Sequence, residues 1–259
     1  MFSLTLDNAS ANNNMQDILK KKLSLQDSLL CDGQFFHVRC CAHILNLKVQ
    51  EGLKVTSEAL DKIKDSIKYI KASEERMKSF LECVSQVGGI DTKIGLRLDV
   101  CTRWNSTCTM LESAIRYRRA FSNLQLIDRN YKFAPTNEEW TKGRKCDFLH
   151  LFYVITNLIS NTCYPTSNLY FMQVWNIECL LKANLESEDL VIKSMATRIK
   201  VKFDKYSNDY SVVLALGAVL NPRMKLGMIK YCYSQLDPNT CQEKVDHIKN
   251  KLETLFDEY

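Results

Sequence analysis

The sequence SLTLDNASAN at residues 3–12, read together with FFHVRCCAHILNL at residues 35–47, decides how the N-terminal part of the chain folds. Leucines alternate with Thr5 in a short run typical of a β-strand, and Asp7 follows it directly. Turn and cap residues then lead into helical apolar spacing. The second stretch also runs from a short strand into a helix. Together they predict a β-α-β-α unit with parallel strands and a right-handed crossover.

Asp7 is the first candidate for chemistry. A strand that ends in an aspartate places its carboxylate at the carboxyl edge of a sheet, where open α/β sheets bind ligands and metal ions. The alternative interpretation is structural, because an aspartate at a strand-to-helix turn also caps the helix that follows. The sequence around residue 7 leaves both interpretations open.

Residues after position 57 show helical rather than strand periodicity. A heptad-like stripe predicts one helix that ends at Gly88-Gly89 and packs antiparallel in a bundle. The stripe consists of Leu60, Ile63, Ile67, Ile70, Met77, Leu81 and Val84, with Glu74 at the one missing seam position. Thr136 and Glu139 have the spacing of a capping box. Later helices are predicted at about 140–159, from Pro165, and at 188–206, 210–220, 223–235 and 238–259.

The predicted fold is therefore mainly α, with a small α/β N-terminal piece. We expect an α/β segment at residues 1–55 with two parallel strands, followed by a helical domain at residues 56–259. The chain has 259 residues, of which 46% are hydrophobic and 25% charged, so it can build a large core. Few glycines (8) and prolines (4) favour long helices.

Charge and cysteine content narrow the class of protein. The net charge of +5 permits a nucleic-acid partner without demanding one. Eleven cysteines, without a C-x-x-C pair or a signal peptide, indicate a reducing intracellular compartment rather than a disulfide framework. No apolar run reaches the length of a membrane span, so we expect no membrane partner.

Five motifs in order carry a family resemblance: LTLDNASAN, HVRCCAHILNL, TRWNST, PTSNLYF and LNPRMK. With them the chain resembles plant hAT-superfamily transposases, in particular the domesticated RICESLEEPER and DAYSLEEPER type with a BED zinc finger. The resemblance covers essentially the whole chain. It implies a ribonuclease-H-like fold interrupted by a helical insertion, in which residues 1–55 look like the fourth and fifth strands. The first three strands, the BED finger and the C-terminal dimerisation segment of the family are not in this sequence.

The resemblance also implies a catalytic role for Asp7. Similar enzymes hold two Mg²⁺ or Mn²⁺ ions with three carboxylates, and Asp7 matches the second of these. The other two would belong to segments outside this chain. A single carboxylate cannot hold a metal pair. We therefore expect a chain that binds no metal cofactor and does not cut DNA, with Asp7 a vestigial ligand unless missing segments complete the site.

Two further motifs match DNA-positioning residues of the family. Cys40 and His43 match its C-x-x-H motif, which implies a role in positioning DNA or the active-site edge. A zinc site, or a buried cysteine beside a backbone-bonded histidine, are the alternatives. Arg103 and Trp104 match its R-W motif, in which the indole stacks near an unstacked base. The alternative is that Trp104 packs in the core of the helical bundle.

Arg116 and Arg119 follow on what is predicted to be the same helix as Trp104. At a spacing of i, i+3 they share a face and can extend a phosphate-contacting stripe. The alternative is a solvated helix face with ion pairs.

Three hypotheses of function follow. The first is a transposase-derived, nuclear DNA-binding fragment without strand cleavage. The second is a helical interaction scaffold that binds protein partners, and the third is a non-functional mobile-element remnant. The sequence defines neither the DNA sequence that is recognised nor the oligomeric state.

Overall fold

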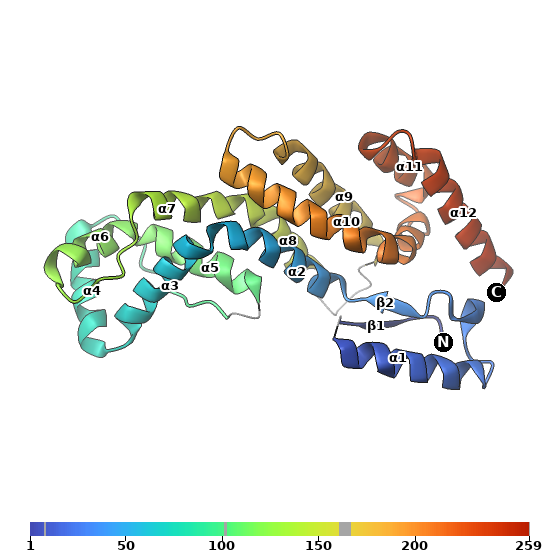
Figure 1. The fold of residues 1–259 in the computed structure, drawn as a ribbon, viewed down its shortest axis with the longest axis horizontal. Coiled ribbons are helices and arrows are strands. Elements are labelled where there is room, and N and C mark those ends of the chain that lie inside the picture. The colour runs from blue at the N-terminus through green and yellow to red at the C-terminus, as the bar shows by residue number, and fades with distance from the viewer. Residues whose placement is uncertain (8, 101–102, 161–166, 259) are drawn as a thin grey trace. The chain divides into compact units, whose positions relative to one another are not determined.

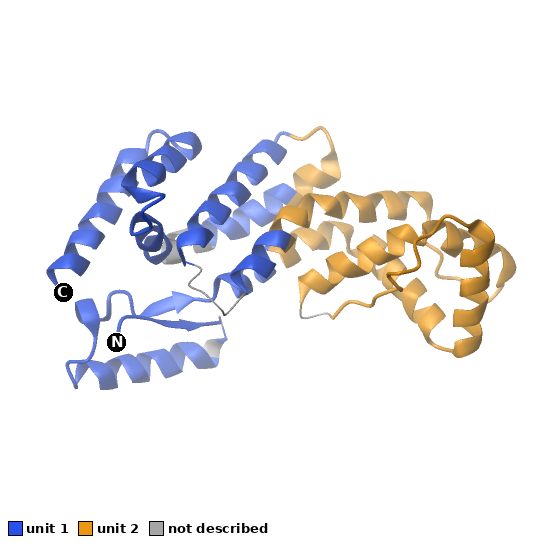
Figure 2. Cartoon of the chain, turned by 180° about the vertical axis from the view of Figure 1, so that it is seen from behind, with its two compact units in different colours: residues 1–48, 154–186, 196–259 blue, residues 49–153, 187–195 orange. Residues whose placement is uncertain are grey.

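The computed structural model describes residues 1–7, 9–100, 103–160 and 167–258. Most of these residues are helical, and one small sheet lies near the N-terminus (Figure 1). The chain divides into two compact units (Figure 2). Unit 1 comprises residues 1–48, 154–186 and 196–259, and unit 2 comprises residues 49–153 and 187–195. The predicted fold class, mainly α with a small parallel sheet, is confirmed.

The sheet of unit 1 has two strands, β1 (Leu4–Leu6) and β2 (His37–Arg39). They pair in parallel, as predicted, with Leu6 opposite Arg39. Between them the chain forms α1 (Ser10–Ser24), which runs along the sheet in Figure 1, and a 3-10 helix (Leu30–Gly33). Helix α2 (Cys41–Leu53) follows β2, so the second strand runs into a helix as predicted.

The rest of unit 1 is helical. Its elements are the end of α8 (His150–Ile159), α9 (Ser167–Asn184), most of α10 (Leu190–Val219), α11 (Lys225–Leu236) and α12 (Cys241–Asp257). Buried side chains of α9, α10, α11 and α12 form a cluster that also contains Phe35 from the segment before β2. The predicted helix start at Pro165 lies outside the described residues.

Helix α10 corrects the prediction of two helices at 188–206 and 210–220. It is continuous over 30 residues. The polar run YSNDY at 206–210 contains neither proline nor glycine. Because only those two residue types strongly oppose a helix interior, the backbone continues through the run.

Unit 2 is a bundle of shorter helices. They are a 3-10 helix (Lys54–Thr56), α3 (Ser57–Lys71), α4 (Glu74–Val87), α5 (Trp104–Arg116), α6 (Arg118–Ile127), α7 (Asn137–Arg144) and a 3-10 helix (Lys145–Leu149). Its core contains a chain of aromatic contacts. The ring centroids of Phe80 and Phe121 lie 5.1 Å apart, and those of Phe121 and Trp140 lie 5.6 Å apart.

The long helix predicted from residue 57 to Gly88 is wrong, because the chain breaks between α3 and α4. Ser73 is extended, with φ −151° and ψ 154°, and its hydroxyl accepts a hydrogen bond from the backbone N–H of Arg76. This N-cap starts a new helix and changes which face is buried. Phe80 is therefore in the core, whereas Leu81, a predicted seam residue, is 52% exposed.

The predicted capping box is confirmed at the start of α7. The backbone N–H of Glu139 donates to Thr136 Oγ1 at 3.2 Å, and the N–H of Thr136 donates to Glu139 Oε2 at 2.7 Å. Two N–H groups that the helix itself leaves unpaired are thus satisfied.

Candidate functional site

Asp7 and Cys40 lie at the same edge of the sheet in unit 1. Leu6 pairs with Arg39, so the next residue of each strand leaves at the carboxyl edge. The backbone N–H of Cys40 donates to the carbonyl of Leu6 at 2.7 Å, which extends the pairing by one hydrogen bond. The sequence thus placed these two residues together correctly.

The Asp7 carboxylate is engaged in its own turn. Its Oδ1 accepts a hydrogen bond from the backbone N–H of Ala9 at 3.0 Å and one from Asn12 Nδ2 at 2.6 Å. These bonds support the start of α1, where Ala9 supplies no capping side chain. Within the part of the chain that the structure describes, no three His, Cys, Asp or Glu side chains are grouped to hold a metal ion. A pair of Mg²⁺ or Mn²⁺ ions needs several carboxylate ligands, of which Asp7 supplies one.

Cys40 and His43 mark the start of α2. Both side chains are half-buried, and the carbonyl of Cys40 accepts the hydrogen bond from the N–H of Ile44 that opens the helix. The structure brings both residues to the edge where Asp7 lies. Their DNA-positioning role stays a prediction.

Arg103 and Trp104 have opposite environments although they are neighbours. Trp104 is 1% exposed, and its ring meets that of Tyr153 edge-on, with centroids 6.4 Å apart. Arg103 is exposed, and no described residue forms an ion pair with its guanidinium. The ring of Trp104 is thus part of the packing of unit 2, as expected if Trp104 is a core residue of the helical bundle. Its stacking on a base stays a prediction that requires the indole to leave this packing.

Asp99, Val100 and Arg103 make polar contacts within unit 2. Lys64 Nζ forms an ion pair with Asp99 Oδ1 at 2.8 Å, and both side chains are largely buried. The backbone N–H of Val100 donates to Ser106 Oγ at 2.7 Å, and the N–H of Arg103 donates to the carbonyl of Val100 at 2.8 Å. The backbone position of Arg103 is therefore fixed, while its side chain faces solvent.

Arg116 and Arg119 do not share one helix, which corrects the prediction. Helix α5 ends at Arg116 and α6 begins at Arg118, with Tyr117 at ψ 6° between them. The Tyr117 hydroxyl donates to the carbonyl of Ile94 at 2.9 Å, a tertiary contact that fixes the residue at the break.

The two arginines also differ in their ion pairs. Arg116 forms an ion pair with Glu112 at 2.7 Å, which is the alternative that the sequence left open. Arg119 is exposed, and none of the described residues pairs with it.

Lys48 is a buried charge that the sequence analysis missed. Its side chain is 0% exposed in unit 1, and Nζ lies 3.8 Å from the ring centroid of Phe203. Burial lowers the pKa of Lys48 to about 7. One sequence feature could have predicted this burial: Lys48 lies four residues after Ile44 and so on the apolar face of α2.

None of the helices in the described ranges combines the length and the hydrophobicity that crossing a membrane requires.

Comparisons with known families match the two larger parts of the chain. The ZBED1 RNase-like helical domain matches residues 38–147, and the hAT-like transposase, RNase-H fold, matches residues 168–259. The zinc finger BED domain-containing protein RICESLEEPER 2 of Oryza sativa subsp. japonica is 36% identical over the whole of this chain. This chain is hAT transposase-like. It is related to the RICESLEEPER and DAYSLEEPER proteins.

Other relatives of the hAT-like chain agree. The putative AC transposase of Zea mays is 35% identical and DAYSLEEPER of Arabidopsis thaliana 27% identical, each over the full chain. The hAT-like chain spans only 36% of RICESLEEPER 2, 32% of the AC transposase and 37% of DAYSLEEPER. No solved structure matches it. The predicted domain division between residues 55 and 56 stays a prediction.

Proposed function

We propose that this hAT-like chain associates with DNA in the nucleus and does not cut it. The observation that carries the proposal is the arrangement at the start of α5, where an exposed Arg103, whose backbone N–H donates to Val100, precedes a buried Trp104. A guanidinium that is unpaired and held near one position is suited to contact a phosphate. Trp104 anchors this position by its packing.

Arg119 supplies a second phosphate contact in the proposal. It is exposed on α6 near Asn123, whose amide donates one hydrogen to Gln86 and can donate its second to a phosphate oxygen. Arg116 is a weaker candidate for phosphate binding than Arg103 or Arg119, because its guanidinium would first have to leave Glu112. The net charge of +5 favours the approach to a polyanion.

At the sheet edge we assign Asp7 to the turn before α1 and not to catalysis. A two-metal centre would supply activated water for strand cleavage. It would need further carboxylates beside Asp7, and the hydrogen bonds from Ala9 and Asn12 already occupy one of its oxygens. Cys40 and His43 lie at the same edge, and in the proposal they border the path of the DNA.

A helical protein-interaction module is the competing function. The observation in its favour is an exposed apolar end of α6, where Leu126 is 83% and Ile127 53% exposed. Exposed apolar side chains of this kind are typical of protein contacts when they gather in patches.

Salt-dependent binding separates the two functions. Fluorescence anisotropy with a labelled duplex and a labelled hairpin is measured between 50 and 200 mM NaCl, in the range where phosphate contacts respond strongly. Two phosphate contacts predict a slope of log K against log salt of about −2. The Arg103→Gln, Arg119→Gln double variant should bind with a flatter slope. No binding by the wild-type chain at 50 mM salt would contradict the proposal and leave the interaction module.

A further inference from the structure

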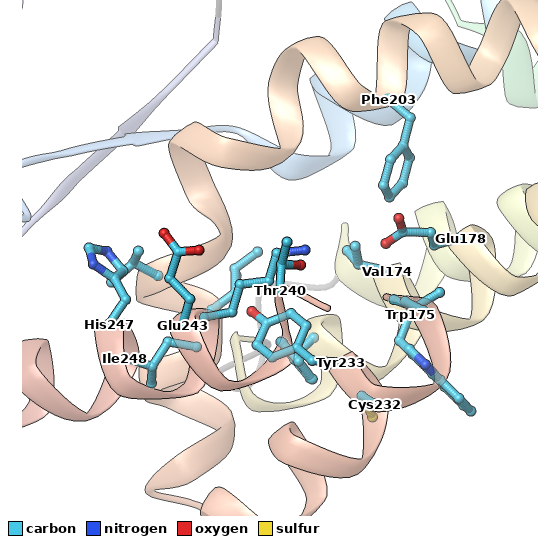
Figure 3. Close-up of a pocket in the computed structure, with 15 residues that line it drawn as sticks. Val174, Trp175, Glu178, Phe203, Cys232, Tyr233, Thr240, Glu243, His247 and Ile248 are labelled. Atoms are coloured by element: carbon cyan, nitrogen blue, oxygen red, sulfur yellow. The ribbon is translucent and has the colours of Figure 1, made fainter. Parts of the chain in front are cut away.

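Unit 1 contains a cavity of about 470 Å³ between its last four helices. Figure 3 shows its walls, which come from α9, α10, α11 and α12. Much of the lining is apolar and includes Val174, Trp175, Phe203 and Ile248. Pockets for small ligands are roughly 300–1,000 Å³ and combine apolar walls with a few polar groups. The volume and the lining of this cavity match that description.

The carboxylate in the cavity wall is already compensated by the chain itself. Lys200 Nζ lies 3.9 Å from Glu178 Oε1 and also pairs with Asp204. Lys244 and Lys48 add two further positive charges that act on Glu178. Burial and the nearby Asp204 raise the pKa of Glu178, whereas the three lysines lower it. Glu178 therefore has counter-charges without any ligand.

The aromatic rings of the wall are likewise engaged by ammonium groups of the chain. Lys48 Nζ lies 3.8 Å from the ring centroid of Phe203, and Lys244 Nζ lies 5.5 Å from that of Tyr233. Rings attract cations, and these two already have one. A charged ligand of either sign would thus meet counter-charges that are already paired, and it would lose its hydration on entry. An uncharged ligand avoids that cost.

Tyr233 provides a polar group that is available to such a ligand. Its ring lies among the labelled side chains of the cavity in Figure 3, and no residue in the described ranges forms a hydrogen bond with its hydroxyl. Burial raises the pKa of Tyr233 to about 12, so the hydroxyl stays protonated at neutral pH and can donate. Thr240, another hydroxyl of the wall, already donates to Asp237 Oδ2 at 2.6 Å. Glu243 and His247 also line the cavity, but they are exposed and solvated by water.

We propose that this cavity binds an uncharged organic molecule with an apolar ring body and one hydroxyl or carbonyl oxygen. The oxygen accepts a hydrogen bond from the Tyr233 hydroxyl, and the body packs against Val174 and Trp175. Neutral aromatic alcohols, phenols and ketones have this chemistry. The cavity lies in unit 1, whereas Arg103 and Arg119 of the proposed DNA contact lie in unit 2. The two functions can therefore be tested separately.

The test is calorimetric titration of the full chain at neutral pH with three probes that share one ring system. Naphthylmethanol is the neutral probe, naphthylmethylammonium the cation and naphthoate the anion. We expect naphthylmethanol to bind and each ion to bind at least about tenfold more weakly, because an ion must give up more hydration. No binding of naphthylmethanol at sub-millimolar concentration, or equal binding of either ion, would overturn the proposal.

Variants test whether the binding occurs in this cavity. Tyr233→Phe keeps the ring and removes the donor, so the affinity for naphthylmethanol should fall about threefold to tenfold, as for one lost neutral hydrogen bond. Tyr231→Phe is the matched control, because Tyr231 is 54% exposed on the same helix and does not line the cavity. It should bind like the wild type.

Val174→Phe fills the cavity without altering its charge and should abolish binding. Unchanged affinity in either Tyr233→Phe or Val174→Phe would overturn the proposal. Circular dichroism checks that each variant is folded. If Val174→Phe does not fold, Tyr233→Phe compared with Tyr231→Phe decides alone.

Discussion

Lys48 Nζ lies 3.8 Å from the ring centroid of Phe203, and the whole lysine side chain is shielded from solvent. A buried ammonium is stable only with compensation. The ring face of Phe203 attracts the ammonium group. Burial lowers the pKa of Lys48; Cys41, Glu178 and Asp204 raise it, and Lys200 lowers it further.

The first prediction concerns pH. Because the pKa of Lys48 is about 7 in the folded chain and 10.5 when unfolded, the unfolded chain binds more protons between these values. The free energy of unfolding should therefore rise with pH across this range, by on the order of 1 kcal/mol per pH unit. Below pH 7 Lys48 is protonated in both states and contributes no slope.

Lys48→Met should remove this slope. Urea unfolding at pH 6, 7, 8 and 9 measures it, and the variant should exceed the wild type most at pH 6 to 7. Equal slopes for the two proteins would show that Lys48 keeps an ordinary pKa.

The second prediction concerns the separate roles of the arginines. Arg103→Gln should weaken DNA binding and make the salt slope flatter by about 1, the value for one lost phosphate contact. Arg116→Gln is the matched control, because its guanidinium pairs with Glu112. Anisotropy titrations at several salt concentrations measure both. An equal loss in the two variants would contradict the assignment to Arg103.

The third prediction concerns the contact between α9 and α10. A Cβ atom at Gly217 would lie 2.6 Å from Ser167 Oγ and 2.9 Å from its Cβ. Gly217→Ala should therefore destabilise the chain by about 1–3 kcal/mol, the usual cost of overpacking. Gly227→Ala is the control, since its Cβ would meet no atom within 4 Å. That change should be neutral or stabilise by up to about 1 kcal/mol. Denaturant unfolding measures the change in the free energy of unfolding for each variant. Similar changes in Gly217→Ala and Gly227→Ala would mean that α9 and α10 separate easily.

The fourth prediction concerns Asp7. The wild-type chain should leave supercoiled plasmid intact with Mg²⁺ or Mn²⁺, and Asp7→Ala should not alter that result. Asp7→Ala should lower the thermal midpoint slightly, because the N–H of Ala9 loses its acceptor. Asp7→Asn keeps an acceptor oxygen and should melt like the wild type. Nicking by the wild type that Asp7→Ala abolishes would refute the structural role.

The fifth prediction separates a folded protein from a mobile-element remnant. Two strands alone are marginally stable, but the sheet here is accompanied by α1 and by a helical core in the same unit. We therefore expect the purified chain to melt cooperatively. Circular dichroism at 222 nm measures this, and a broad, non-cooperative loss of signal together with aggregation would support the remnant hypothesis.

Local signals explain what could be predicted from the sequence. The strand before Asp7, the helix that follows the second strand and the capping box at Thr136 depend on residues close together in the chain. The break at Ser73 also had a local signal, a serine before two glutamates, but the apolar stripe across it hid the cap. Local sequence patterns predicted the structure correctly wherever they allowed a single interpretation.

Tertiary contacts explain what could not be predicted. The break at Tyr117 depends on a hydrogen bond to Ile94, 23 residues earlier. The cavity has walls from four helices, so no single stretch reveals it. The burial of Lys48 depends on Phe203, far along the chain, and a lysine is ordinarily expected in solvent.

The neighbouring residues at the start of α5 have a consequence for how such a chain evolves. Arg103 faces solvent and Trp104 fills the core, so under the proposed function selection on DNA affinity acts at codon 103 and selection on folding at codon 104. Genetic drift can replace Arg103 while purifying selection retains Trp104. Comparing substitution rates at codons 103 and 104 among related genes would then show which lineages keep the proposed DNA contact.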